Sequence, residues 1–399
     1  MKRAHLTNQS VPVFTRKMRK VTIGFYIAVA FLYWISLYLY MPTLPTYVQT
    51  KTDDLALVGT VLSMYGLWQA IVRLPLGIAV DWLGHRKPFV IAGLVLAGLG
   101  AWRMGVANDF TGLLVGRSVT GIAAAAWVPL LVAFSSLFPV DESVRATAIL
   151  TFVSTSGRLL ATSSTGVLNA WGGFPLAFFL ASGIAGMAIL LVLLTHEKVL
   201  PQLQPSWNGI ARIITRRDVL LPSMLAAVSQ YANWATTFGF IPILARQLGG
   251  SDVMQSMLVT FNLLVLIATN LFATKLMQWL GPRSLIRLGF LLIAIGAGLT
   301  AAATSLPMLF AAQFFLGMSQ GINFPVLMGL SIRFVADSER NIAMGLHQSV
   351  YGIGSFGGPW LSGILAQAIG LRPMLFVTAF VTLIPGLVGA SKLDMKASS

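Results

Sequence analysis

Long apolar runs, separated by short polar stretches, occupy almost the whole sequence. A helix that crosses a bilayer needs about 20 predominantly apolar residues. Only 10% of the 399 residues are charged, against about 25% in a typical soluble domain, so no soluble domain fits between the runs. The sequence therefore predicts an all-α membrane protein with twelve transmembrane helices, at about residues 22–46, 55–80, 88–107, 110–138, 145–169, 174–195, 219–245, 253–279, 285–304, 307–334, 341–366 and 372–391.

The runs fall into two groups of six, and a longer polar stretch separates the groups. This break contains Pro201, Pro205 and several cations, which is typical of a linker. We therefore expect an N-terminal arm (1–21), an N-terminal six-helix half (22–195), a linker (196–218), a C-terminal six-helix half (219–391) and a tail (392–399).

Positive charge is distributed unevenly between the two membrane sides that such helices create. Most of the 27 Lys and Arg residues fall in the arm, the linker, the tail and every second short loop. Cytoplasmic loops of membrane proteins carry an excess of Lys and Arg. We therefore expect a multi-pass protein of the inner (plasma) membrane with both termini in the cytoplasm. This placement at helix ends accounts for the net charge of +15, and no nucleic-acid partner is expected.

Short motifs recur in the same order in the two groups of helices. Two halves related by an axis along the membrane normal, with a substrate site between them, are typical of secondary transporters. The repeat therefore predicts two pseudo-symmetric halves. The matching pairs are Trp82-Leu83-Gly84-x-Arg86 with Trp279-Leu280-Gly281-x-Arg283, Gly121 with Gly317, and Pro129 with Pro325.

The stretch 77–88 joins the second and third runs and reads GIAVDWLGHRKP. It contains a carboxylate at Asp81, a glycine turn at Gly84 and cations that include Arg86 and Lys87. This pattern resembles the loop signature of the major facilitator superfamily, and the chain resembles that family over nearly its whole length. The resemblance implies two six-helix halves that rock about a central substrate site.

In that family the loop is thought to hold the cytoplasmic side shut while the outer side is open. The resemblance implies the same role here, with Arg86 or Arg145 as a partner for the Asp81 carboxylate. A loop that only fixes the membrane topology remains the alternative. The expected cytoplasmic gate residues are Gly77, Asp81, Gly84, Arg86, Lys87 and Arg145.

A second motif, Arg117-Ser118-Val119-Thr120-Gly121, lies in the fourth run. It is similar to a signature of the drug/proton antiporter branch of the superfamily, which implies that Arg117 influences proton coupling. That branch usually carries a Gly-Pro-x-x-Gly-Gly element in the fifth helix, where this chain has Ser156-Gly157-Arg158-Leu159-Leu160. The resemblance to this branch is therefore partial.

Three arginines, Arg73, Arg117 and Arg158, lie inside predicted helices. An unpaired charge in the membrane interior costs at least a few kcal/mol, so each should face a cavity or a partner. Substrate contact is favoured for Arg158, which lies near the middle of the fifth run among serines and threonines. For Arg73, pairing near the gate is as plausible as ligand contact. For Arg117, hydrogen bonds to backbone carbonyls are as plausible as a role in coupling.

The chain has 12 Asp and Glu residues, and none falls in the middle of a run. Proton antiporters for cationic drugs normally need a buried carboxylate that exchanges a proton for the cation. The cavity is therefore expected to be positively charged and to favour an anionic or zwitterionic solute. If protons are coupled, His347 has a suitable unperturbed pKa. A structural role for this histidine, with the proton carried on the substrate, is the alternative.

Aromatic and amide side chains cluster in the first helix of each half, and further amides follow in later helices. They suit a mid-sized, partly aromatic or polyhydroxylated solute, although single Tyr and Trp residues more often pack between helices. The candidate residues for substrate binding or coupling are Arg73, Arg117, Arg158, Tyr33, Trp34, Tyr38, Gln230, Asn233, Trp234, Asn323 and His347.

Several functions are excluded or disfavoured. The chain has no cysteine, which excludes disulfides, thiolate metal sites and cysteine nucleophiles. No phosphate-binding glycine loop and no pair of residues with metal-ligand spacing is found, so no enzyme, cofactor or metal is expected. The predicted function is a monomeric secondary active transporter that exports or exchanges a small organic solute. Uptake of an organic anion, facilitated or proton-coupled, and a non-transporting receptor or scaffold are the alternatives.

Overall fold

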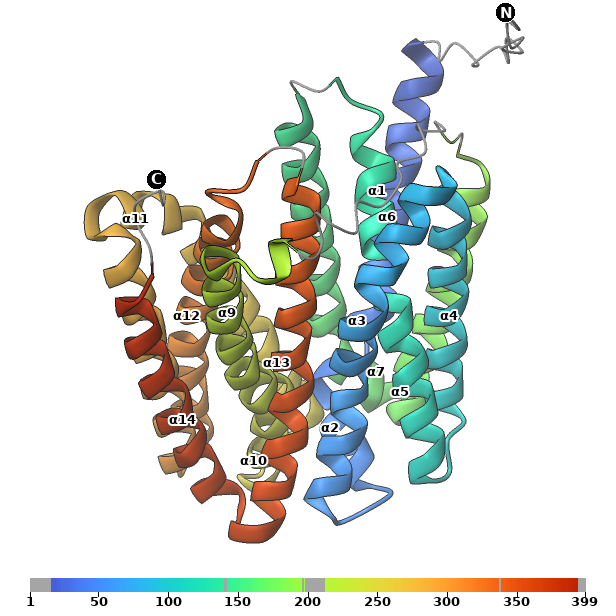
Figure 1. Ribbon diagram of the computed structural model, residues 1–399. Coiled ribbons are helices and arrows are strands. Elements are labelled where there is room, and N and C mark those ends of the chain that lie inside the picture. The colour runs from blue at the N-terminus through green and yellow to red at the C-terminus, as the bar shows by residue number, and fades with distance from the viewer. Residues whose placement is uncertain (1–15, 140–141, 196, 198–211, 337–338, 394–399) are drawn as a thin grey trace, which may run out of the picture.

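The computed structural model describes residues 16–139, 142–195, 197, 212–336 and 339–393. Within these residues the secondary structure is helical, without strands, and the long helices run side by side (Figure 1). Most of the expected arm and linker, and most of the tail, lie outside the described residues.

Eight elements form the first half of the chain. Pro42 and Pro45 interrupt the first crossing segment, because proline lacks the N–H group that an unbroken helix needs, so α1, η1 and α2 form one segment. The long α7 contains two crossing segments, since its backbone leaves helical geometry at Gly172 and Gly173. The elements are α1 (Arg16–Tyr38), η1 (Met41–Thr43), α2 (Leu44–Gln49), α3 (Leu55–Leu83), α4 (Lys87–Gly105), α5 (Phe110–Ala124), α6 (Trp127–Ser135) and α7 (Ser143–Leu193).

Seven elements form the second half. The segment that begins with α9 passes through a π-helical turn, η3, into α10. The long α11 contains two crossing segments, which meet at Gly281. The elements are α9 (Arg217–Ala235), η3 (Thr236–Phe240), α10 (Ile241–Gln247), α11 (Asp252–Ala302), α12 (Leu306–Ile332), α13 (Arg340–Ile369) and α14 (Leu371–Ser391).

The glycine of the repeated Trp-Leu-Gly motif has a positive φ in both halves. Gly84, after α3, has φ = 70°, and Gly281, within α11, has φ = 72°. Glycine adopts a positive φ without the steric cost of a Cβ atom. The ψ angles differ, at −3° for Gly84 and 158° for Gly281. The two motifs thus share their place, where the chain turns back between two crossing segments, but not the full backbone conformation.

Nine segments of the described chain are long and apolar enough to cross a membrane. One of them, Arg145–Leu193, contains two crossing segments because of the kink in α7. The segments α9–α10 and α13 also run the length of the bundle (Figure 1), but polar side chains such as Gln230 and His347 lower their hydropathy. The protein therefore has twelve crossing segments in two halves, and this prediction from the sequence is confirmed.

Both described ends of the chain lie at the same end of the bundle (Figure 1). We call this end, where α1 begins and α14 ends, the termini side, and we call the end that carries α2 and α10 the opposite side. The first helix begins at Arg16, before the apolar run that starts near residue 22. Lys and Arg are good helix formers, so the basic turns extend the helix beyond its apolar part.

The two halves meet along two seams, one between α3 and α13 and the other between α7 and α11. Glycines let the backbones touch at the α3–α13 seam. A Cβ atom on Gly59 would lie 2.2 Å from the Pro359 oxygen, and one on Gly66 would lie 2.4 Å from the Phe356 nitrogen. Nearer the termini side, a Cβ atom on Gly352 would lie 2.8 Å from an alanine side chain of α3. This seam is therefore closed along much of its length.

Candidate functional site

α7 packs closely against α1 in the middle of the first half. Gly157 permits this approach, because a Cβ atom there would lie 2.8 Å from the Phe31 carbonyl oxygen. The adjacent Arg158 lies over two rings of α1, with its guanidinium carbon 4.7 Å from the Trp34 ring centroid and 5.7 Å from that of Tyr38. Cation–π contacts of this kind stabilise a charge that has left water. The structure thus brings together three residues that the sequence singled out.

Arg117 of α5 is fully buried, and none of its three guanidinium nitrogens has a hydrogen-bond partner among the described residues. Its guanidinium carbon lies 4.4 Å from the Tyr65 ring centroid, and the buried Tyr40 side chain lies within range of its charge. The hydrogen bonds to backbone carbonyls that the sequence left open for Arg117 are therefore not seen. Tyrosine side chains are its closest electrostatic partners instead.

Arg73 of α3 is also buried, with 8% of its surface exposed, whereas Arg158 is partly buried. None of the described carboxylates forms an ion pair with Arg73. The Arg73 guanidinium instead interacts electrostatically with the hydroxyl groups of Tyr33 and Tyr351. The Tyr351 hydroxyl also lies within electrostatic range of Arg158. Because Tyr351 belongs to α13, a hydroxyl of the second half lies within electrostatic range of two cations of the first half.

A continuous row of aromatic rings joins the surroundings of Arg158 to those of Arg117. The ring centroids are 6.1 Å apart for Tyr38 and Phe238, 5.1 Å for Phe238 and Trp234, and 5.3 Å for Trp234 and Tyr65. All four side chains are buried. We call these four residues the aromatic bridge, because the row starts in the first half, passes through the second and returns to the first.

Polar side chains join the halves on the opposite side of the bundle. Thr46 Oγ1 donates a hydrogen bond to Gln255 Oε1 (2.9 Å), and Asn169 Nδ2 donates one to Asp252 Oδ2 (2.9 Å). Arg246 lies 3.8 Å from the same carboxylate group. We call these five residues the polar seal.

A further hydrogen bond between the halves, from Thr260 Oγ1 to Thr162 Oγ1 (3.0 Å), joins α11 to α7. A Cβ atom on the nearby Gly166 would lie 2.4 Å from the Asp252 oxygen. The α7–α11 seam is therefore tight toward the opposite side. Two further hydrogen bonds between the halves, from the Leu55 N–H group to Gln367 Oε1 (2.9 Å) and from Arg246 Nη1 to the Thr46 carbonyl oxygen (3.5 Å), also lie on the opposite side.

Toward the termini side, the same two helices enclose a cavity of about 840 Å³. This size falls within the range of small-molecule sites, about 300–1,000 Å³. One of its lining residues, Thr155, accepts a hydrogen bond from Arg158 Nη2 (3.4 Å), so the cavity adjoins the cationic site. The lining residues are Thr147, Ala148, Thr151, Phe152, Thr155, Ser156, Leu159, Leu264, Leu266, Ile267, Asn270 and Leu271.

The second half contributes neutral amides in place of cations. Gln313 Oε1 accepts hydrogen bonds from Thr237 Oγ1 (2.9 Å) and Asn262 Nδ2 (3.0 Å). Asn323 Nδ2 donates to Ser229 Oγ (3.4 Å). These bonds join α9, η3, α11 and α12 within one half, so the structure does not bring Asn323 to the cations.

The remaining candidates on α9 divide between the interior of the second half and the aromatic bridge. Gln230 and Asn233 are both buried. Asn233 lines a crevice within the second half, and its neighbours there come from α9, α11 and α12. Trp234, by contrast, stacks on a ring of the first half. Of these three residues, only Trp234 is part of the aromatic bridge.

His347 holds α13 against α9. Its Nδ1 atom lies 3.0 Å from the Ser223 hydroxyl, which itself donates to the Val219 carbonyl oxygen (2.6 Å). The other ring nitrogen, Nε2, has no hydrogen-bond partner among the described residues. This contact is the structural role that the sequence offered as an alternative to proton coupling.

Tyr33 also has a packing role. Its hydroxyl donates to the Ala123 carbonyl oxygen (2.9 Å), which joins α1 to α5. The residues that the sequence missed are Tyr65, Phe238 and Tyr351. Each is a lone aromatic residue in a long apolar run, and its spacing alone does not distinguish it from a packing residue.

The loop after α3 binds the end of α7 in the same half. The Glu197 carboxylate accepts hydrogen bonds from the backbone N–H groups of Arg86 and Lys87. Lys87 Nζ donates to the carbonyl oxygens of Leu193 (2.9 Å) and Thr195 (2.7 Å). These bonds satisfy free N–H groups at the start of α4 and free carbonyls near the end of α7. Gly84 supplies the left-handed turn before them.

Arg145 is not part of this loop contact. Its side chain is 73% exposed and lies 3.9 Å from Glu142, and its pairing with the Asp81 carboxylate stays a prediction. A Cβ atom on Gly77 would have no neighbour within 4 Å, and the Asp81 side chain lies outside what the structure describes.

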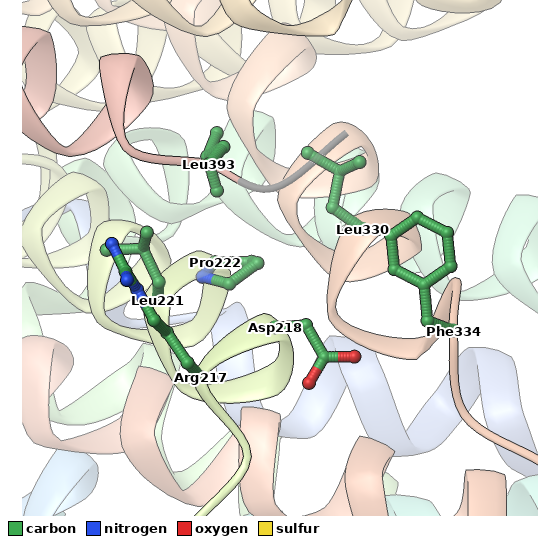
Figure 2. Close-up of a pocket in the computed structure, with 7 residues that line it drawn as sticks. All are labelled: Arg217, Asp218, Leu221, Pro222, Leu330, Phe334 and Leu393. Carbon is green, nitrogen blue, oxygen red and sulfur yellow. The ribbon is translucent and has the colours of Figure 1, made fainter. Parts of the chain in front are cut away.

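A small crevice at the termini side contains the start of α9 (Figure 2). Its volume of about 10 Å³ accommodates at most one water molecule. The Asp218 carboxylate accepts hydrogen bonds from Arg216 Nε (3.0 Å) and Nη2 (2.6 Å), and these bonds lower the pKa of Asp218. Arg217 extends away from this carboxylate (Figure 2). The crevice therefore contains a structural ion pair and is not a substrate site.

These features define a class of protein. Two six-helix halves enclose buried cations and a cavity that is closed on one side of the bundle and open on the other, as in membrane transporters with alternating access. The family model of the Major Facilitator Superfamily matches the sequence twice, over residues 26–229 and 223–393. The chain belongs to this superfamily.

Curated relatives and solved structures agree with this assignment. An uncharacterized MFS-type transporter of Methanocaldococcus jannaschii is 20% identical over 91% of this chain and 98% of its own length. A chloramphenicol efflux pump of Mycobacterium tuberculosis is 25% identical over 92% of this chain and 90% of its own. The inward-facing, occupied structure of a bacterial homolog of the human lysosomal transporter Spinster has a TM-score of 0.78 at 16% identity, covering 96% and 99% of the two chains.

Proposed function

We propose that the protein is a secondary active transporter that exports or exchanges a small organic solute with an anionic or zwitterionic group. The termini side faces the cytoplasm, because Lys and Arg residues concentrate at that end of the helices. The structure is then the inward-facing state of the transport cycle. The halves 22–195 and 219–391 move against each other about the cationic site.

The charge of the cavity supports this substrate class. Arg158 adjoins the cavity. Arg73 and Arg158 both lie within electrostatic range of Tyr351, and Arg117 lies at the far end of the aromatic bridge, over the Tyr65 ring. Every carboxylate whose side chain the structure describes lies in a loop or near a helix end. An anionic group beside Arg158 gains charge-assisted hydrogen bonds and offsets the cost of burying the cation. An organic cation at the same place finds no opposite charge.

Alternating access follows from contacts that join the halves. A solute that touches both Arg158 and Tyr351 binds better when the halves approach each other on the termini side. Such differential affinity is what allows a ligand to shift a conformational equilibrium. Closure of that side then requires the aromatic bridge and the polar seal to separate. We propose that the gate residues Gly77, Asp81, Gly84, Arg86 and Lys87 stabilise the resulting outward-facing state.

Direction and coupling are further parts of the proposal. The chloramphenicol efflux relative favours export. Uptake of an organic anion is the second candidate, because the same arginines bind an anion from either side. The proton, if one is coupled, is carried on the substrate, since His347 is engaged in the contact between α13 and α9. A non-transporting scaffold is disfavoured because it has no use for a cavity of this size that adjoins a cation.

A thermal-shift screen of purified protein tests the proposal. Wild type is compared with Arg158→Gln, which removes the cavity cation, and with Arg287→Gln, which removes an exposed cation elsewhere. A ligand present at 100 times its Kd stabilises the fold by about 2.7 kcal/mol. We expect stabilisation by organic anions or zwitterions in wild type and Arg287→Gln, and its loss in Arg158→Gln. Stabilisation by lipophilic cations that survives Arg158→Gln would contradict the proposed substrate class.

A further inference from the structure

The cavity between α7 and α11 opens to the side of the bundle as well as toward the termini side. Phe152 and Leu271 line it, and these side chains are 74% and 77% exposed. Both residues belong to apolar segments that cross the membrane, Phe152 to Arg145–Leu193 and Leu271 to the last turn of Asp252–Ala273. Exposed apolar side chains at such positions face lipid, because the bilayer core contains no water. The cavity is therefore continuous with the hydrocarbon region of the bilayer.

The other seam has no such opening. Its backbones touch at Gly66 and Gly352, and a Cβ atom on Gly345, nearer the termini side, would lie 3.4 Å from the Leu74 side chain. The two halves are therefore in contact along this seam well toward the termini side. A gap on one side of the bundle only is a specific feature of the α7–α11 seam.

The walls and the deep end of this lateral opening differ in polarity. Leu159, Leu264 and Ile267 give the walls an apolar character. At the deep end, Thr155 lines the cavity and accepts the hydrogen bond from Arg158. The opening thus presents an apolar surface to the bilayer and one cation next to its polar end. This arrangement is complementary to a molecule with an apolar tail and an acidic head group.

We infer that the transported solute is an amphiphilic anion whose head group binds Arg158 and whose apolar chain lies in the α7–α11 opening, in contact with the bilayer. This inference rests on the proposed function and narrows its substrate class. Hydrocarbon in the opening removes apolar wall surface from water, which is favourable in proportion to the area buried. A small polar anion leaves that wall surface uncovered.

A homologous series of straight-chain carboxylates, from butanoate to decanoate, tests the inference. Binding is measured to the protein in phosphatidylcholine nanodiscs, with empty nanodiscs as the reference for partition into lipid. Each methylene that enters the opening strengthens binding about threefold to fourfold. We therefore expect the Kd to fall steadily with chain length. A Kd that is independent of chain length would overturn the inference, while binding of the shorter carboxylates would still support an anion transporter.

Two alanines of α7 provide a matched pair of variants. Ala148 lines the opening about 15 Å along the helix from Arg158 at 1.5 Å per residue, whereas Ala170 is exposed on α7 and does not line it. We expect Ala148→Trp to abolish the gain from the longest chains and to leave butanoate binding unchanged. Ala170→Trp should behave like wild type. Equal effects of both substitutions would contradict occupation of the opening by the chain.

The head group is tested separately with Arg158→Gln and with the corresponding alkylammonium ions. We expect Arg158→Gln to raise the Kd of every carboxylate by a similar factor, because it removes the same head-group contact at each length. Alkylammonium ions should bind more weakly than carboxylates of equal length. If the two series bind alike, the opening is a general apolar site and the inference is wrong. If no carboxylate binds above the empty nanodiscs, the proposed substrate class fails as well.

Discussion

The two seams between the halves differ in both packing and chemistry. The α3–α13 seam is closed by backbone contact at glycines along much of its length. The α7–α11 seam has such a contact at Gly166 and side-chain hydrogen bonds on the opposite side, and it is open toward the termini side. Backbone contact between helices leaves little freedom to separate, while single side-chain hydrogen bonds are easily exchanged. The comparison indicates that α3 and α13 form the pivot of the rocking motion and that α7 and α11 form its moving edge.

The largest expected effect comes from filling the closed seam. In Gly66→Val, the new Cβ atom meets the Phe356 backbone nitrogen at 2.4 Å, and backbone atoms cannot rotate away. Overpacking of this kind costs about 1–3 kcal/mol, occasionally more, and a clash with backbone falls at the upper end. We expect a large fall in the thermal unfolding midpoint of the purified protein. The control is Gly183→Ala, because a Cβ atom there has no neighbour within 4 Å. A midpoint that Gly66→Val leaves unchanged would refute the description of this seam as closed.

A disulfide across the tight part of the moving edge is expected to stop transport. The hydroxyl oxygens of Thr162 and Thr260 are 3.0 Å apart, so cysteines at both positions are close enough to bond. The chain has no native cysteine, which leaves this pair as the sole thiols. We expect oxidation of Thr162→Cys/Thr260→Cys to abolish flux in proteoliposomes, and a reductant to restore it. Full transport by the oxidised protein would show that these helices do not separate during the cycle.

A smaller shift is expected from the polar seal. Gln255→Leu removes the acceptor of the Thr46 hydrogen bond. Loss of one such bond costs about 1 kcal/mol, which is roughly a fivefold change in the ratio of two states. We expect a larger outward-facing population, seen as shorter distances between spin labels at Phe152 and Leu271. An unchanged distance distribution would mean that the seal does not contribute to the balance between states.

The smallest effect is expected within one half, where neither seam is involved. The pKa of Asp218 is lowered in the folded protein by the hydrogen bonds from Arg216. Its stabilising contribution is therefore present above the unfolded pKa of about 3.9 and is lost as the pH falls through the lower folded value. Asp218→Asn should cost less than about 1 kcal/mol at pH 7, and the difference from wild type should shrink below pH 4.

Unfolding midpoints of wild type and Asp218→Asn between pH 7 and pH 3 measure this effect. Arg217→Gln serves as the control, because Arg217 extends away from the carboxylate (Figure 2). A difference that stays constant over the whole range would mean that the carboxylate gains nothing from Arg216. A changed distance between Phe152 and Leu271 labels would mean that this contact is coupled to the seams.

The sequence predicted the fold because bilayer length, charge asymmetry and the repeated loop motif are local features of the chain. The runs 219–245 and 341–366 are less apolar than the others, because polar residues of α9–α10 and α13 serve contacts inside the bundle. Arg158, Trp34 and Tyr38 could be singled out because a cation inside a membrane helix needs a partner and aromatic residues lay in a helix expected to line the cavity. Their proximity depends on how closely α7 approaches α1, which follows from Gly157.

Contacts between distant segments were not predictable in the same way. Tyr65 and Phe238 become part of the aromatic bridge only because α3 and η3 lie beside each other in the assembled bundle. Asn323 and His347 looked like cavity residues, since buried polar groups often mark function. In the structure they form hydrogen bonds within the second half, which polar residues in a helix bundle also do to satisfy their own groups. The periodicity of a helix does not distinguish a polar residue that lines a cavity from one that forms hydrogen bonds within the bundle.

Accessibility of two substituted serines tests the central claim most directly. Ser156 lines the open part of the α7–α11 seam, and Ser355 is buried where α13 meets Gly66 of α3. Ser156→Cys and Ser355→Cys are treated with a membrane-impermeant maleimide in inside-out and right-side-out vesicles. We predict rapid labelling of Ser156→Cys from the cytoplasmic face only, slowed by a bound organic anion, and protection of Ser355→Cys from both faces. Equal labelling of the two cysteines, or labelling of Ser156→Cys only from outside, would contradict a cavity open to the cytoplasm at this seam.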